Sequence, residues 1–168
     1  MNAGAYGGEM KDILKRVSVM EPGGRIRELL AEELDLGYRH SCIPENKYIV
    51  LSASIVLKKG TEETIRGTME VLAARRREKQ PLEYPSAGST FKRPSGYFAG
   101  KLIEDAGLRG FREGGAQVSE KHCGFVINRD QATAEEIRGL CRTVQRRVME
   151  TAGVKLETEV KMIGWEDA

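Results

Sequence analysis

The chain has 168 residues, of which 40% are hydrophobic and 31% charged, and its formal net charge is +2 at pH 7. This length fits one medium-sized domain or two small ones. Acidic and basic residues are nearly balanced, unlike the one-signed charge of a typical nucleic-acid-binding protein, so we expect no nucleic-acid partner. No apolar run approaches the ~20 residues that cross a bilayer, and no signal-peptide pattern opens the chain, so we expect no membrane association.

The cysteines argue against a disulfide framework and against a zinc site. There are three of them, Cys42, Cys123 and Cys141, and they are widely spaced without a C-x-x-C pair. An odd number at these spacings is typical of free thiols in a reducing compartment. We therefore expect a cytoplasmic protein that holds no metal.

The chain opens with a glycine-rich segment, MNAGAYGGE, that follows no strand or helix. Small residues around Tyr6 allow backbone to pack closely against a flat or phosphorylated ligand. The spacing is not G-x-G-x-x-G, and a disordered tail is the alternative interpretation.

Residues 11–20 and the Pro22-Gly23-Gly24 turn predict a hairpin, and residues 28–34 predict a short helical turn. Arg39 follows at the end of an element, where a planar guanidinium often binds a carboxylate or phosphate; a surface ion pair is the alternative. Residues 48–57 are apolar on both faces, so we expect a strand that is central or well covered.

Residues 61–79 predict a helix with acids at its start and arginines at its end. The run from Arg75 to Arg77 is typical of a solvated helix end. It is also a candidate contact for a diphosphate in the segment that follows, or for RNA.

That next segment, residues 85–94, reads PSAGSTFKRP and predicts a rigid, cationic loop. Ser89 lacks the G-x-S-x-G context of an activated nucleophile. A second possibility is that Ser89 donates a proton to a carbon acid while Lys92 and Arg93 hold an anion. An ordinary turn with a solvated Lys-Arg pair is the alternative.

The rest of the chain predicts a short helix at 97–106, a buried strand at 123–128, and a long helix behind the capping box that Thr133 begins. His122, before the strand, is more often a structural group than a catalyst. Residues 156–163 alternate and predict a last strand with Glu159 and Lys161 on one face; a solvated sheet face is the alternative.

Five motifs in this order, NAGAYGGEM, GYRHS, YPSAGSTFKRP, VSEKHCGFVIN and LETEVKMIG, resemble the UDP-N-acetylenolpyruvoylglucosamine reductase (MurB) family, in particular its shorter second type. The resemblance implies an α+β protein: residues 1–58 would form the C-terminal part of a flavin-binding lobe, and residues 59–168 a small α+β substrate-binding domain. The N-terminal flavin-binding region of the family is missing from this sequence, and it would be the chain's structural partner.

The resemblance also implies a chemistry. FAD, reduced by NADPH, would reduce an enolpyruvyl ether of a UDP-sugar in the synthesis of a peptidoglycan precursor. By motif match, Arg39 would polarise the substrate carboxylate, Ser89 would protonate the α-carbon, and Glu159 would hydrogen-bond the carboxylate or enolate. The implied binding residues are Asn2, Gly4, Ala5, Tyr6 and Gly7 for the cofactor and Tyr38, Lys92, Arg93 and Lys161 for the substrate.

The missing flavin region leaves a second interpretation open, in which the chain is a non-catalytic UDP-sugar-binding or interaction module. On either interpretation, we expect the isolated chain neither to retain FAD nor to turn over, because only one wall of the cofactor site is present.

Overall fold

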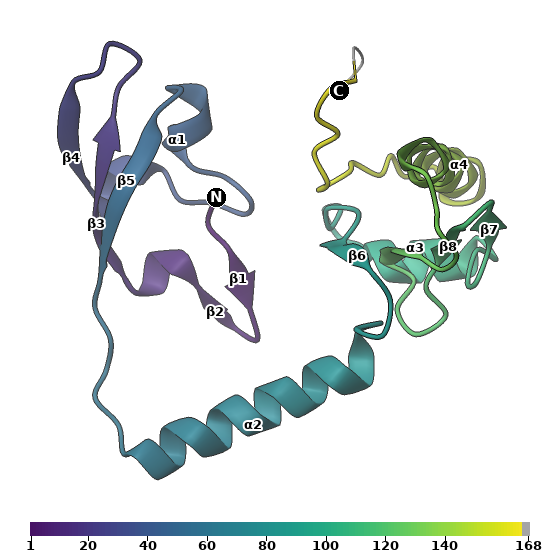
Figure 1. Cartoon of the computed structure of the whole chain (residues 1–168), viewed down its shortest axis with the longest axis horizontal. Coiled ribbons are helices and arrows are strands. Elements are labelled where there is room, and N and C mark those ends of the chain that lie inside the picture. Colours follow the sequence, from purple (N-terminus) through teal and green to yellow (C-terminus); the bar gives the residue numbers. More distant parts are fainter. Residues whose placement is uncertain (166–168) are drawn as a thin grey trace. The chain divides into compact units, whose positions relative to one another are not determined.

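The computed structural model describes residues 1–165, and the chain divides into two compact units, Met1–Glu62 and Glu63–Ala168. Each unit combines helices with an antiparallel sheet, which confirms the predicted α+β class (Figure 1).

The first unit opens with a tight hairpin of strands β1 (Gly4–Ala5) and β2 (Gly8–Glu9). Its turn residues, Tyr6 and Gly7, have φ of 52° and 85°. Positive φ at both central positions is the signature of a two-residue type I′ turn, which glycine favours. The glycine-rich opening is therefore an ordered hairpin and not a disordered tail.

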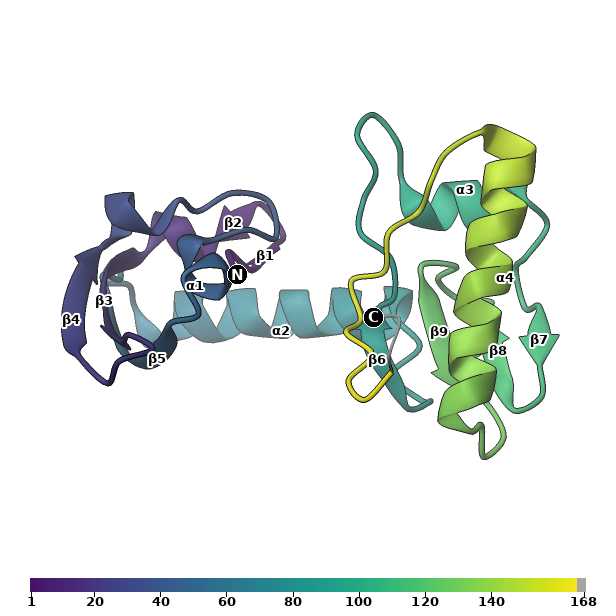
Figure 2. The ribbon, with the colours of Figure 1, turned by 90° about the horizontal axis from the view of Figure 1, so that it is seen from above.

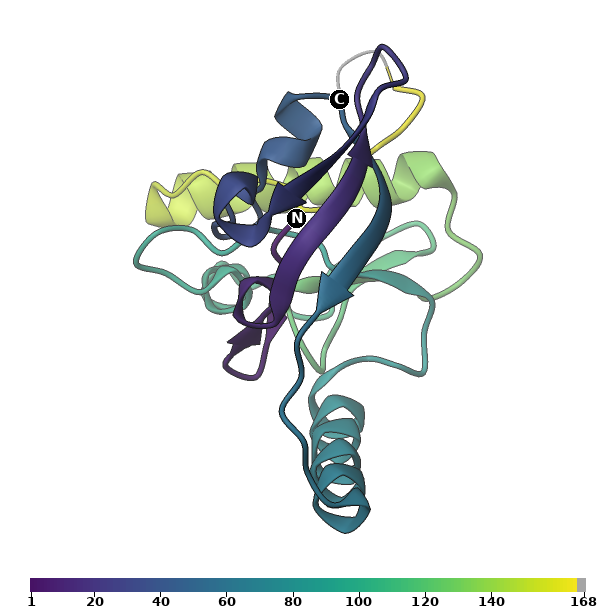
Figure 3. The same cartoon turned by 90° about the vertical axis from the view of Figure 1, so that its left-hand side faces the viewer.

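A three-stranded antiparallel sheet follows, formed by β3 (Leu14–Met20), β4 (Ile26–Leu30) and β5 (Ile49–Ile55). Strand β3 lies between the other two, and β3 and β4 form the predicted hairpin (Figure 3). The predicted helical turn is shorter than expected, because β4 continues to Leu30 before a 3₁₀ turn, Ala31–Leu34. A short helix, α1 (Cys42–Glu45), precedes β5.

The core of this unit is small, and strand β5 lies at the edge of the sheet. The buried apolar residues of the cluster are Val17, Val19, Leu29 and Leu34. Residues 48–57 do form a strand, but the prediction that it is central or well covered was wrong: Ile49 is 56% exposed and Leu51 is 48% exposed. An apolar pattern identifies a strand but does not say which neighbours cover it.

Helix α2 (Glu62–Lys79) confirms the predicted helix, and none of its residues is buried. Its apolar stripe includes Ile65 and Met69, which are 49% and 64% exposed. The arginines at its end are exposed as well. This helix therefore contributes little to the core of the second unit.

The second unit is built on a four-stranded antiparallel sheet in the order β6-β9-β8-β7. The strands are β6 (Ser86–Ser89), β7 (Arg112–Glu113), β8 (Ala116–Val118) and β9 (Phe125–Asn128). Helix α4 (Ala134–Ala152) packs on β7, β8 and β9 and on helix α3 (Ala99–Asp105), as Figure 2 shows. The segment predicted as a loop thus contains strand β6, while the buried strand before the capping box is confirmed.

Helix α4 begins and ends as its sequence predicts. The Thr133 hydroxyl accepts a hydrogen bond from the Glu136 N–H (3.2 Å), and the Glu136 carboxylate accepts one from the Thr133 N–H (2.8 Å). Gly153 ends the helix with φ of 65°. One stripe faces the core, where Leu140 and Val144 are fully buried.

The predicted strand at 156–163 was wrong for most of its length. The segment pairs only around the bridge between Phe91 and Thr158, through hydrogen bonds from Lys92 N–H to the Glu157 carbonyl and from Glu159 N–H to the Thr90 carbonyl. Beyond these two bonds, both 2.8 Å long, the chain bends, so the alternating pattern does not extend into a sheet face.

Candidate functional site

Thr90 is the point at which three segments of the second unit meet. Its N–H donates to the Gly124 carbonyl (2.8 Å), its hydroxyl accepts from the Val126 N–H (2.9 Å), and its carbonyl accepts from the Glu159 N–H (2.8 Å). The residue is 3% exposed. A single buried threonine therefore joins the end of β6, the start of β9 and the C-terminal segment.

Through this connection, Ser89 and Glu159 lie one residue and one backbone hydrogen bond apart, although they are far apart in the chain. Ser89 is the last residue of β6, directly before Thr90, and its side chain is exposed. Glu159 is hydrogen-bonded through its backbone to Thr90 and is half-buried. Gly88, with φ of 86°, lies in the register shift of β6, where the strand bulges before Ser89.

The basic residues of the site separate into two groups. One cavity of about 710 Å³ is lined by Lys92 and Lys161, together with the acidic Glu159. The Lys92 ammonium pairs with the Glu157 carboxylate at 3.0 Å. Arg93 has other partners: its guanidinium carbon lies 3.9 Å from the centroid of the Phe98 ring. Its Nε also donates to the Tyr97 carbonyl (3.1 Å), so the turn that follows holds this arginine.

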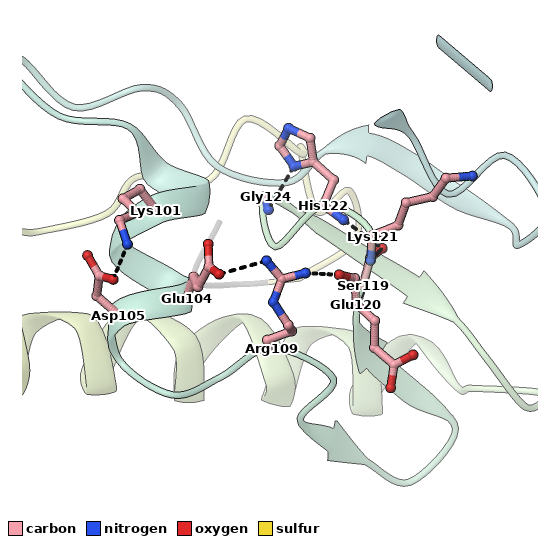
Figure 4. Close-up of polar contacts among 9 residues, drawn as sticks. All are labelled: Lys101, Glu104, Asp105, Arg109, Ser119, Glu120, Lys121, His122 and Gly124. Atoms are coloured by element: carbon pink, nitrogen blue, oxygen red, sulfur yellow. Dashed lines mark hydrogen bonds and ion pairs between the residues drawn. The ribbon is translucent and has the colours of Figure 1, made fainter. Parts of the chain in front are cut away.

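His122 stabilises the turn that carries the Gly124 carbonyl, the acceptor of the Thr90 N–H. Its Nδ1 accepts a hydrogen bond from the Gly124 N–H (3.0 Å), as Figure 4 shows, and its ring meets the Phe125 ring edge-on at 5.0 Å. The Ser119 hydroxyl, 1% exposed, accepts from the His122 N–H (3.2 Å). His122 thus supports Gly124, the residue whose carbonyl accepts the hydrogen bond from the Thr90 N–H.

The cysteines of the second unit are not set up as nucleophiles. Burial raises the pKa of the Cys123 thiol, and burial together with the charge of Glu113 raises the pKa of Cys141 to about 11. A thiol whose pKa is raised stays protonated at neutral pH and is unreactive. Beside Cys123, Arg109 bonds the Glu104 carboxylate (2.8 Å) and the Glu120 carbonyl, which fastens helix α3 to the neighbouring turn (Figure 4).

Arg39 lies in the first unit, in a turn closed by paired backbone bonds between Gly37 and His40. Its φ of 53° is in the left-handed region, which is uncommon for a residue with a side chain. Its guanidinium carbon lies 5.2 Å from the centroid of the Tyr38 ring, so these two predicted residues are neighbours. A left-handed arginine is held against an intrinsic cost of ~1–3 kcal/mol, and residues in such conformations cluster at functional sites.

Asn2 supports the opening hairpin from inside. Its amide nitrogen donates to the Glu9 carboxylate (2.6 Å), its oxygen accepts from the Lys11 N–H (2.9 Å), and the residue is 2% exposed. Hydrogen bonds from Lys11 and then Asn2 lower the pKa of Glu9. Asn2 also pairs with Tyr38, which ties the hairpin to the arginine turn.

The other predicted cofactor residues, Gly4, Ala5, Tyr6 and Gly7, are exposed. Three of them have no large side chain, so a flat ring system could approach their backbone closely, and the Tyr6 ring lies beside them. These residues fit a cofactor as one wall of a site. Asn2 uses one amide hydrogen and one lone pair of its oxygen within the hairpin, and it is 2% exposed.

Within residues 1–165, no three or more His, Cys, Asp and Glu side chains are grouped as metal ligands. None of the helices in this range has the length and apolar character of a membrane span.

The second unit is thus a small α+β domain in which a strand end, a buried threonine and a C-terminal segment assemble a polar site. A family model described as "UDP-N-acetylenolpyruvoylglucosamine reductase, C-terminal domain" matches residues 80–163. The chain belongs to this family, which confirms the resemblance that its motifs indicate.

Relatives match nearly the whole chain. A UDP-N-acetylenolpyruvoylglucosamine reductase of Agathobacter rectalis is 59% identical over 98% of this chain, and one of Clostridioides difficile is 56% identical over 98%. The crystal structure of the reductase (MurB) from Thermus caldophilus superposes with a TM-score of 0.80 at 37% identity, over 96% of this chain. The chain spans about half of these proteins: 52%, 54% and 57% of their lengths, respectively.

Proposed function

We propose that this chain carries the substrate-binding part and three catalytic residues of an NADPH-dependent flavoenzyme. The reaction is the reduction of UDP-N-acetylglucosamine enolpyruvate to UDP-N-acetylmuramate, a step of peptidoglycan precursor synthesis. The observation that carries the proposal is the Thr90 junction, which joins the Ser89 strand to Glu159 inside a domain of the reductase family.

FAD, when bound and reduced by NADPH, would supply a hydride to the β-carbon of the enolpyruvyl group. The exposed hairpin at Gly4, Ala5, Tyr6 and Gly7 would form one wall of its site. Asn2 would hold that wall in shape through Glu9 and the Lys11 N–H. The part of the relatives that this chain does not span would provide the rest of the cofactor site.

Arg39 would bind the carboxylate of the enolpyruvyl group. Hydride addition at the β-carbon leaves negative charge on the α-carbon and the carboxylate, so a fixed cation at this group lowers the barrier. A guanidinium has the planar fork that matches a carboxylate. The closed turn from Gly37 to His40 and the adjacent Tyr38 ring would keep that fork oriented.

Ser89 would donate the proton that completes the reduction. Its O–H bond breaks, a C–H bond forms at the α-carbon, and the serine oxygen regains a proton from solvent afterwards. A serine hydroxyl is a weak acid in water, so the developing serine oxyanion needs a nearby cation. Lys92, three residues further on and half-buried, is the candidate for that role.

Glu159 would hydrogen-bond the carboxylate or enolate of the substrate. It can donate such a bond only in its protonated form, which a dry site favours. Lys161 would interact with the diphosphate of the substrate as a point charge. We place the reaction in the cytoplasm, where a reducing environment would keep the cysteines as thiols.

The test is a chimera in which the N-terminal half of the Agathobacter rectalis relative precedes this chain. We expect the chimera to be yellow and to oxidise NADPH when UDP-N-acetylglucosamine enolpyruvate is added. Ser89→Ala should still allow NADPH to bleach the flavin absorbance, but substrate should no longer restore it. Ser95→Ala, at an exposed serine of the next turn, is the matched control.

Normal turnover by the Ser89→Ala chimera would remove the assignment of the proton donor. A yellow chimera that never responds to the substrate would remove the proposed reaction itself.

The second candidate function is a non-catalytic UDP-sugar-binding or interaction module. The observation in its favour is that the chain matches only about half of each relative. In that case, the isolated chain would bind the UDP-sugar without flavin. For the isolated chain we expect no copurified flavin absorbance and no NADPH oxidation, and either signal would contradict this expectation.

A further inference from the structure

His122 lies in the turn between strands β8 and β9, and the proposed reaction gives it no role. The turn holds this residue on both sides. The Ser119 hydroxyl accepts from the His122 N–H (3.2 Å), and the His122 carbonyl accepts from the Phe125 N–H (3.0 Å). The Phe125 ring meets the imidazole edge-on at 5.0 Å. The imidazole therefore has a fixed place, although the residue is exposed.

The hydrogen bond at Nδ1 determines which nitrogen of the imidazole carries the hydrogen. The Gly124 N–H can only donate, so the His122 Nδ1, 3.0 Å away, accepts and carries no hydrogen (Figure 4). In the neutral ring, the hydrogen is then on Nε2. Within this turn, His122 acts as an acceptor through Nδ1.

Two glycines make room for the imidazole. A Cβ atom at Gly124 would lie 2.9 Å from the imidazole Cε1 and 3.1 Å from Nδ1, so a side chain there would push the ring away. A Cβ atom at Gly100, in the first turn of α3, would lie 3.3 Å from the Gly124 nitrogen and 3.4 Å from Cε1. The ring therefore lies between the turn and the start of α3, where these two glycines let backbone and imidazole approach closely.

Gly124 connects the imidazole with the serine strand. Its N–H is bound by the His122 Nδ1, and its carbonyl accepts from the Thr90 N–H (2.8 Å). Ser89 directly precedes Thr90 and ends strand β6. Glycine has more backbone freedom than any other residue, and a rotation at Gly124 would turn its carbonyl away from Thr90. The bond to the imidazole restricts this rotation.

We propose that His122 is a positioning residue for Ser89: its Nδ1 holds Gly124, and Gly124 holds the end of β6 at Thr90. A displacement of ~1 Å at a reacting group can cost ~100-fold in rate, so this support has kinetic value. That Ser89 is the proton donor rests on the proposed function. That His122 fixes the end of the serine strand rests on the contacts alone.

Two variants separate the roles of the two ring nitrogens. His122→Asn keeps an acceptor oxygen at the δ position, whereas His122→Gln moves the acceptor oxygen to the ε position. In NMR spectra of the chain, the amide signals of Gly124, Thr90 and Ser89 should shift in the glutamine variant. They should return close to their original positions in the asparagine variant. The signals of buried Leu140 should stay in place in both, which shows that the second unit is folded.

The chimera described above gives the kinetic readout. His122→Gln should lower the kcat of flavin reoxidation by the substrate at least tenfold, while the KM for the substrate and the rate of reduction by NADPH change less than threefold. His122→Asn should remain within threefold of the unmodified chimera in kcat. The control is Lys121→Gln, which changes the neighbouring side chain of the same turn, a partner of Glu83 at 3.4 Å, and should have less than a threefold effect.

A measurement on the unmodified chain does not depend on how the variants fold. The nitrogen NMR shifts of the imidazole should show a hydrogen on Nε2 and none on Nδ1, and a neutral ring with its hydrogen on Nδ1 would overturn the proposal. Unmoved signals of Gly124, Thr90 and Ser89 in a folded His122→Gln variant would overturn it as well.

Rescue by glutamine in place of asparagine, with a raised KM in the asparagine variant, would also overturn the positioning role, because it would mean a contact to the substrate through Nε2. The NMR measurements require no turnover, so their failure overturns only the support of Ser89 by His122. A chimera that never responds to the substrate overturns only the proposed reaction.

Discussion

The two units of this chain bury apolar surface to very different degrees. In the second unit, α3 and α4 pack on a four-stranded sheet, and side chains such as Ile103, Leu140 and Val144 are fully buried. In the first unit, a four-residue cluster is the buried core, while edge strand β5 leaves Ile49 and Leu51 about half exposed. Burial of apolar surface is the main source of stability, so the two units should not be equally stable.

The same difference affects the candidate residues. Ser89 and Glu159 are positioned by hydrogen bonds of buried Thr90, within a well-packed domain. Arg39 is held by a short turn and by Tyr38, on the border of a small core. We therefore expect the second unit to keep Ser89 and Glu159 in position through its own packing. The position of Arg39 in the first unit should depend more on contacts from outside that unit.

Separating the two units is the strongest test of this difference in stability, and we expect it to have the largest effect. As separate polypeptides, residues 63–168 should unfold cooperatively on heating, and residues 1–62 should not, because their core is too small. Circular dichroism melts and the dispersion of amide NMR signals measure this. A cooperative melt of residues 1–62 alone would contradict the difference between the units.

The second largest effect should come from a cavity made in the core of the second unit. Leu140→Ala should lower its unfolding free energy by ~2–5 kcal/mol, because the side chain is completely buried against the sheet. Urea unfolding followed by NMR would resolve the two units. Met149→Ala, on the exposed side of the same helix, should change the free energy by less than ~0.5 kcal/mol. Loss of the Val19 signals together with those of the second unit would mean that the units unfold as one.

Removal of the Thr90 hydroxyl tests the junction. Thr90→Val should lower the unfolding free energy of the second unit by ~1–3 kcal/mol, because the buried Val126 N–H loses its acceptor. The amide NMR signals of Ser89 and Glu159 should also shift. Thr90→Ser keeps the oxygen and should restore those signals, and a Thr90→Val variant with unchanged signals would rule out the junction.

The smallest expected effect concerns pH. The Cys141 pKa is raised from 9.0 to about 11 in the folded chain, chiefly by burial, so folding favours the protonated thiol. The stabilisation that the protonated Cys141 thiol gives the folded chain is therefore fully present well below pH 9. The free energy of unfolding then declines as the pH rises towards 11, by about 1 kcal/mol at pH 10. Urea unfolding of the chain and of Cys141→Ala from pH 8 to 10.5 measures the difference. An identical pH dependence in both would contradict it.

Much of the local structure could be predicted from the sequence. The capping box at Thr133 and the glycine at 153 bound helix α4, and the Pro-Gly-Gly turn defines the β3-β4 hairpin. These signals are local, because they depend on residues within one turn of a helix or hairpin. The motif resemblance also identified the family.

Other features could not be predicted, because they depend on partners distant in the chain. Nothing local distinguishes an apolar central strand from an apolar edge strand, and β5 is the latter. The alternation of residues 156–163 predicted a strand, but only Thr158 forms a β-bridge, with Phe91. Nor did the sequence indicate that Arg138 and Arg142 line a cavity together with Lys92.

By itself, the sequence determined the family, the main helices and turns, and the candidate residues, because short-range hydrogen bonding and motif spacing are written in consecutive positions. Only the tertiary structure decided that Thr90 joins Ser89 to Glu159, and that two arginines of α4 line a cavity with Lys92 and Lys161. These arrangements depend on which backbone groups find partners across the fold, and residue order alone does not specify that pairing.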